Sequence, residues 1–155
     1  MTIKQVDIWL ESTKKGLIDK YNQLGLRASG KWEKELETEQ IQHSTGVKAV
    51  ITGMNYTEQL EIGRLAGSFP PLAPIRQWID DKGIIPKGIT KDSLAFLIGR
   101  KIKEQGIKVP NKYNAGGLVT DVITDKRVNE LVDSVASVVI KDVTSEIYNI
   151  FEEWQ

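Results

Sequence analysis

Apolar residues recur every three or four positions along the C-terminal part of the chain, and this pattern restricts the possible fold more than any other. The period is that of one face of an α-helix, and it persists for about seven turns. A β-strand of that length would be abnormal, although the content of β-branched residues is high for a helix. We therefore predict a helix that begins at a cap on Thr124 or Asp125 and extends to about residue 153. Its apolar face consists of Val128, Leu131, Val132, Val135, Val139, Val143, Ile147, Ile150 and Phe151.

Three shorter helices are predicted upstream, over about residues 3–24, 72–82 and 91–105. Each shows apolar residues at helical spacing and a stop signal at its end. Trp9 and Trp78 fall on apolar faces of the first two, so we expect both side chains in the core. The residues that delimit these helices are Gly25, Gly83, the N-cap Thr90, and Gly106.

The β-structure predicted from the sequence is limited. Residues 36–43 alternate weakly and residues 47–52 are β-branched, with a turn signal between them, so together they predict a hairpin. Leu118–Ile123 is a further strand candidate, and Tyr56–Ile62 fits either a short strand or a helical turn. Gly63–Pro71 contains two glycines and a proline pair, which predicts a loop without regular structure. The predicted fold is α+β: a small antiparallel sheet packed against helices, with a long C-terminal helix.

The chain has 155 residues, which is the length of one ordinary domain, and 40% of them are apolar. We predict a single domain over residues 1–155, made of an N-terminal helix (1–28), a core with the hairpin and two helices (29–106), and a loop or strand plus the long helix (107–155). No secretion signal and no apolar run of about 20 residues is visible, so we expect no membrane association and a cytoplasmic site of synthesis.

Few residues are available for catalysis or metal binding. The chain has no cysteine and one histidine, His43, at the predicted hairpin turn. A phosphate-binding loop is excluded because Ile89 stands where the lysine would follow Gly83 and Gly88. The carboxylate pair Asp80-Asp81 lies at a helix end, where adjacent side chains point apart. We therefore predict no catalytic residue, no metal site and no cofactor, and we expect the protein not to be an enzyme.

Charge is balanced overall but not along the chain. There are 21 basic and 21 acidic residues, yet residues 82–112 carry eight basic and two acidic residues, whereas residues 113–155 carry three basic and eight acidic residues. The two segments could lie against each other in one fold, or the basic face of one subunit could meet the acidic face of the next, as in a head-to-tail ring. A third interpretation is a nucleic-acid-binding module. Its residues would be Arg100, Lys101, Lys103, Lys108 and Lys112.

The segment over residues 56–84 carries the most distinctive motif. A tyrosine is followed by Glu-Ile-Gly-Arg, a glycine loop, Pro-Pro, and a helix that ends in Trp-Ile and Lys-Gly. This run resembles small tailed-bacteriophage virion-assembly proteins of the head–tail connector, neck or tail-completion type. The helix Ser93–Ile102 and the segment Ser29–Trp32 are also similar to that family. The matching motif residues are Tyr56, Glu61, Gly63, Arg64, Gly67, Pro70, Pro71, Trp78, Lys82 and Gly83.

The resemblance implies a structural virion protein that forms part of a multimeric ring and is assembled in the host cytoplasm. Its partners would be further copies of the chain and other phage proteins of the portal, connector or tail, with nucleic acid present only as the passing genome. Trp154 could anchor a partner or fold back on the long helix. We take the candidate interface residues to be Arg100, Lys101, Lys103 and Trp154.

Overall fold

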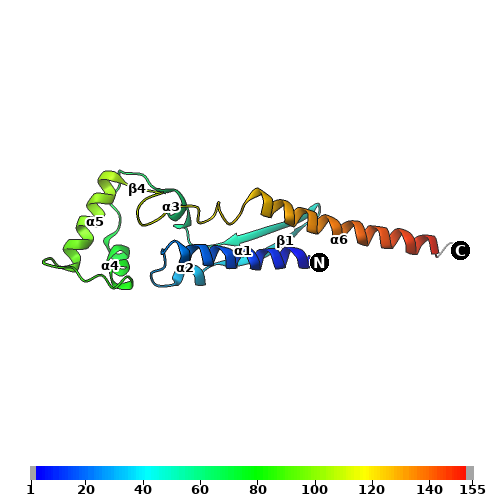
Figure 1. Cartoon of the computed structure of the whole chain (residues 1–155), viewed down its shortest axis with the longest axis horizontal. Coiled ribbons are helices and arrows are strands. Elements are labelled where there is room, and N and C mark those ends of the chain that lie inside the picture. Colours follow the sequence, from blue (N-terminus) through cyan, green and yellow to red (C-terminus); the bar gives the residue numbers. More distant parts are fainter. Residues whose placement is uncertain (1–2, 153–155) are drawn as a thin grey trace.

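The computed structural model describes residues 3–152, and the predicted α+β class is confirmed. Six helices and two small antiparallel sheets are present in that range, and the last helix is much the longest. The molecule is elongated: α4 and α5 lie at one end, and α6 projects from the other (Figure 1). The elements are α1 (Lys4–Gln23), α2 (Lys31–Lys34), β1 (Glu37–His43), β2 (Gly46–Thr52), α3 (Thr57–Ile62), β3 (Gly63–Arg64), α4 (Leu72–Asp81), α5 (Lys91–Gln105), β4 (Ile107–Lys108) and α6 (Asp125–Glu152).

The body of the molecule is built around Trp32. Its side chain is 1% exposed and stacks on the ring of Tyr21, with the ring centroids 4.3 Å apart. The indole N–H donates a hydrogen bond to Thr57 Oγ1 at 2.9 Å, so the buried ring has its polar atom satisfied. Burial is also the main reason why the pKa of Tyr21 is raised to about 12. The remaining buried residues of this cluster are Leu17, Leu36 and Leu118.

The predicted hairpin is confirmed and covers one side of α1. Strands β1 and β2 pair in antiparallel register from Glu37 opposite Thr52 to His43 opposite Gly46. The inward face of β1 is polar. Gln40 donates hydrogen bonds to the carbonyl oxygen of Ile3 and to Asp7 Oδ1. The hairpin is therefore held to the start of α1 by hydrogen bonds as well as by packing.

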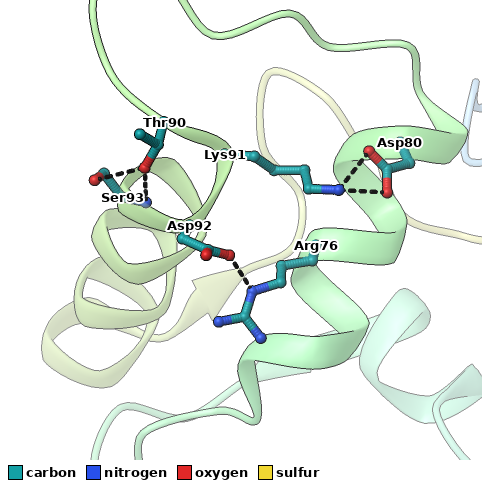
Figure 2. A network of polar contacts seen from close by, with 6 residues as sticks. All are labelled: Arg76, Asp80, Thr90, Lys91, Asp92 and Ser93. Carbon is teal, nitrogen blue, oxygen red and sulfur yellow. Dashed lines mark hydrogen bonds and ion pairs between the residues drawn. The ribbon is translucent and has the colours of Figure 1, made fainter.

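Helices α4 and α5 form a separate unit, which we call the arm. Its small core consists of Ile75, Ile79 and Ala95, with Leu72, Leu94, Ile98 and Ile102 packed around it. The predicted cap is confirmed, since the Thr90 side chain accepts a hydrogen bond from the Ser93 amide at 3.1 Å. Figure 2 shows two ion pairs that join the helices, Lys91 with Asp80 and Arg76 with Asp92.

Three sequence-based predictions need correction. Residues 63–71 are not wholly irregular, because Gly63–Arg64 forms strand β3, paired with β4. Leu118–Ile123 adopts turns instead of a strand, closed by hydrogen bonds from Val122 and Ile123 to the Val119 carbonyl oxygen. Trp78 is 42% exposed, since it lies at the edge of the α4 face whose centre is Ile75 and Ile79. Of the two alternatives for Tyr56–Ile62, the structure shows the helical one, α3.

Among residues 3–152, the hydrogen bonds that join the long helix to the body all lie at the beginning of α6. The Thr124 hydroxyl accepts a hydrogen bond from the Arg127 amide at 3.3 Å, so Thr124 provides the predicted cap. The Arg127 side chain donates to Thr13 Oγ1 at 3.0 Å and to Ser12 Oγ at 2.7 Å, which holds α6 to α1. The next turns of α6 are half-buried at Leu131 and Val135, and the C-terminal half of the helix extends away from the body (Figure 1). Within the part of the chain that the structure describes, none of the helices combines the length and apolar composition that a membrane span needs.

Candidate assembly surfaces

The apolar face of α6 is exposed along much of the helix. Val132, Val139 and Ile150 are 58%, 50% and 52% exposed, although the spacing of such residues normally marks a buried helix face. Exposed apolar faces of this length are typical of interaction surfaces, so this face is a candidate assembly surface. We call this surface the α6 stripe and define it as Val132, Val139, Val143, Ile147 and Ile150.

Carboxylates line one edge of the α6 stripe. Asp142 and Glu146 are one helical turn apart, directly beside Val143 and Ile147 in the sequence, so both lie along the same edge. Residues 128–152 carry five acidic side chains and one basic side chain, Lys141. The projecting part of α6 is therefore both apolar and acidic.

The arm also exposes an apolar surface, and the arm lies at the opposite end of the molecule from the projecting part of α6 (Figure 1). Phe96 and Leu97 of α5 are 49% and 42% exposed, and the ring of Phe69 packs beside Phe96 with centroids 5.6 Å apart. Gly99 makes this arrangement possible, because a β-carbon there would lie 2.8 Å from the Phe69 ring. We call Phe69, Phe96 and Leu97 the arm patch.

Cations continue the face that the arm patch begins. Arg100 follows Phe96 by four residues and Lys103 follows it by seven, while Lys101 follows Leu97 by four, so all three lie next to the patch. Arg100 makes a loose ion pair with Glu104 at 3.8 Å, and the side chains of Lys101 and Lys103 are exposed. The structure thus places Arg100 and Lys103 on the Phe96 side of the arm patch and Lys101 on its Leu97 side, because residues two apart on a helix point in different directions. The fourth predicted interface residue, Trp154, lies outside the described residues.

Most residues of the family motif lie at the joint between the body and the arm. Strands β3 and β4 pair there in antiparallel register, with Gly63 next to the Ile107 carbonyl group and Gly106 next to the Arg64 carbonyl oxygen. Gly67 donates its amide to the Lys103 carbonyl oxygen at 2.8 Å. Arg64 donates a hydrogen bond to Ser68 Oγ at 2.9 Å, and Lys82 Nζ donates one to the Gly25 carbonyl oxygen at 2.9 Å. Pro70 is buried, and Pro71 is the residue before α4.

Glu61 is the motif residue with the most hydrogen bonds. Its carboxylate accepts from the amides of Val119 at 2.8 Å and Thr120 at 3.2 Å, and from the Thr120 hydroxyl at 2.7 Å. Burial of the carboxylate acts to raise its pKa, but these hydrogen bonds together outweigh burial and hold the pKa of Glu61 below its ordinary value. Glu61 therefore fixes the 118–120 turn against α3, and Leu118 enters the body core beneath it.

Other motif residues have simpler roles. Tyr56 precedes α3 and packs on the body core, and burial raises the pKa of its hydroxyl. Gly83 follows α4 in a left-handed conformation with open space around it. Together with the joint contacts, these placements give the motif an architectural role.

Sequence reasoning missed three residues that hold the surfaces in place. Arg127 joins α6 to α1, Thr13 accepts its hydrogen bond while fully buried, and Asn114 donates to the Leu60 carbonyl oxygen at 2.7 Å. The sequence does contain a signal for Thr13, because it is a polar residue on the apolar helix face formed by Val6, Leu10 and Leu17. The sequence contains no such signal for Arg127 or Asn114, since both act through contacts with residues that are distant in the sequence.

Comparison of the chain with family models, curated proteins and solved structures gives no significant match. In residues 3–152 the structure contains no group of three or more histidine, aspartate or glutamate side chains placed to hold a metal ion. The surfaces at the two ends of the molecule are thus the features on which a functional proposal can rest.

Proposed function

We propose that this chain is a structural subunit of a tailed-bacteriophage particle and forms part of a multimeric ring in the head–tail connector, neck or tail. The motif over residues 56–84 suggests the family, and most of its residues shape the joint from which the arm extends. The observation that carries the proposal is the exposed α6 stripe. A helix that leaves its own fold with its apolar face uncovered supports a role in assembly with other chains.

The proposal is tested by counting the chain in purified particles. Phage particles are purified on a density gradient, and peptides of this chain are quantified against those of the major capsid protein. We expect a small fixed copy number, on the order of one ring per particle. Absence of the chain from clean particles would contradict a structural role.

Nucleic-acid binding by the basic 82–112 segment is the second candidate. The observation that favours it is Phe96, an exposed aromatic ring next to Arg100 and Lys103, since exposed aromatics and cations together bind single strands. Several cations of the segment are already engaged, among them Lys91 with Asp80 and Lys82 with a carbonyl oxygen. Filter binding at increasing salt tests this candidate: a steep loss of affinity supports it, and a flat response refutes it.

A further inference from the structure

We propose that the α6 stripe of one copy docks on the arm patch of the next copy, so that assembly proceeds by one repeated head-to-tail contact. This inference rests on the proposed function, because it specifies how the subunits of the assembly meet. The occupant of the α6 stripe is then a second copy of this chain, and the contact surface on that copy is α5.

Position is the first argument for this pairing. The α6 stripe and the arm patch lie at opposite ends of an elongated molecule (Figure 1). Two complementary surfaces at opposite ends of one subunit generate a heterologous contact, which gives a ring when the rotation between copies closes. The two surfaces cannot contact each other within one copy, because the body lies between them.

Charge is the second argument. Asp142 and Glu146 lie along one edge of the α6 stripe, whereas Arg100 and Lys103 lie on the Phe96 side of the arm patch and Lys101 lies on its Leu97 side. Docking the two apolar surfaces brings opposite charges together at their margins, and such complementarity steers association and fixes which partner is accepted.

Charge also disfavours the simplest rival, in which the α6 stripes of two copies pair with each other. The stretch 128–152 has five acidic side chains against one basic side chain, so an α6–α6 contact brings like charges to the same seam. Like charges across a helix contact oppose pairing. The α5 face supplies the cations that a second α6 lacks.

A mixing experiment separates these arrangements. One full-length variant carries Val143→Gln and Ile147→Gln on the α6 stripe, and the other carries Phe96→Gln and Leu97→Gln on the arm patch. Both pairs of side chains are exposed, so circular dichroism should show native folds. Each variant keeps one functional surface, and we expect each to be monomeric alone and to form a 1:1 dimer when mixed, observed by sedimentation velocity.

The control is Tyr148→Gln, which removes an exposed apolar side chain from the opposite side of the same helix. It should assemble as the unmodified chain does, whereas each surface variant should bind a partner copy through the altered surface at least about tenfold more weakly.

Two outcomes would overturn the proposal. Self-association of the arm-patch variant would show that α6 stripes pair with each other. A mixture that stays monomeric would show that the α6 stripe receives a different protein. Either result, obtained with a chain that is present in particles at ring copy number, refutes this contact and leaves the proposed structural role intact.

Discussion

At the scale of single residues, the joint between body and arm depends on two glycines that lack space for a side chain. Gly63 and Gly106 have φ values of +88° and +69°, and a β-carbon on either would overlap a carbonyl oxygen of the opposite strand. We expect Gly63→Ala to lower the free energy of unfolding by about 3 kcal/mol or more. Gly83→Ala is the matched control, because Gly83 also has a positive φ but open space, and should cost about 1–2 kcal/mol. Equal losses in urea unfolding would show that the joint can shift.

Glu61 makes a pH-dependent contribution at the same scale. The pKa of Glu61 is lower in the folded state than in the unfolded chain, so the unfolded state binds more protons. The stabilisation is therefore fully present at pH values above the pKa that Glu61 has in the unfolded chain. It is lost as the pH falls through the folded pKa. Glu61→Gln should therefore be less stable than the unmodified chain at about pH 7, and the difference should narrow toward about pH 3. Urea unfolding across this range measures the gap. Glu58→Gln, an exposed glutamate of the same helix, should give a profile parallel to that of the unmodified chain.

At the scale of elements, α6 is held to α1 by Arg127. Its guanidinium donates to Ser12 and to buried Thr13, and its carbonyl oxygen accepts from the Trp9 indole at 3.0 Å. Arg127→Gln removes the guanidinium contacts, so amides in the first turns of α6 should exchange about tenfold faster while those of the body stay protected. Hydrogen exchange read by mass spectrometry measures both. Lys126→Gln, at an exposed neighbouring position, should leave exchange unchanged. Unchanged exchange in Arg127→Gln would mean that other contacts anchor the helix.

The elements that sequence patterns predicted well are those whose signals are local. The hairpin and the four longer helices follow from periodicity and caps, because residues three or four apart decide a helix face. The segment 118–123 was predicted wrongly because its β-branched composition competes with Gly116 and Gly117, both at positive φ, and with the Glu61 carboxylate that takes its amides. Strand β3 was missed because its partner lies about forty residues downstream, beyond any local pattern.

At the scale of the whole molecule, the sequence indicated the two charged surfaces but not their separation. The basic and acidic segments are visible as a count along the chain, and contact between them within one fold was an open alternative. In the structure the arm lies at one end and most of α6 lies at the other (Figure 1). This separation depends on the three-dimensional arrangement of the body between them, which the sequence pattern does not contain. The exposure of the α6 stripe could not be predicted from the sequence either. The apolar periodicity of a helix is the same whether its own fold or another chain covers the apolar face.

Charge reversal tests the proposed contact between copies, because exposed charges at its margins affect association and not the fold of either copy. Lys101→Glu with Lys103→Glu puts an acidic group at each margin of the arm patch, one of which faces Asp142 and Glu146 of the next copy, and should weaken assembly at low salt. Asp142→Lys with Glu146→Lys should weaken it as well, whereas the chain with all four changes should recover. Sedimentation velocity at low and at about 0.5 M salt measures this, since the differences should shrink as salt screens the charges. Lys31→Glu with Lys34→Glu changes the net charge equally on exposed body positions and should have little effect. If the fourfold variant assembles no better than the double variants, the two charged margins do not face each other.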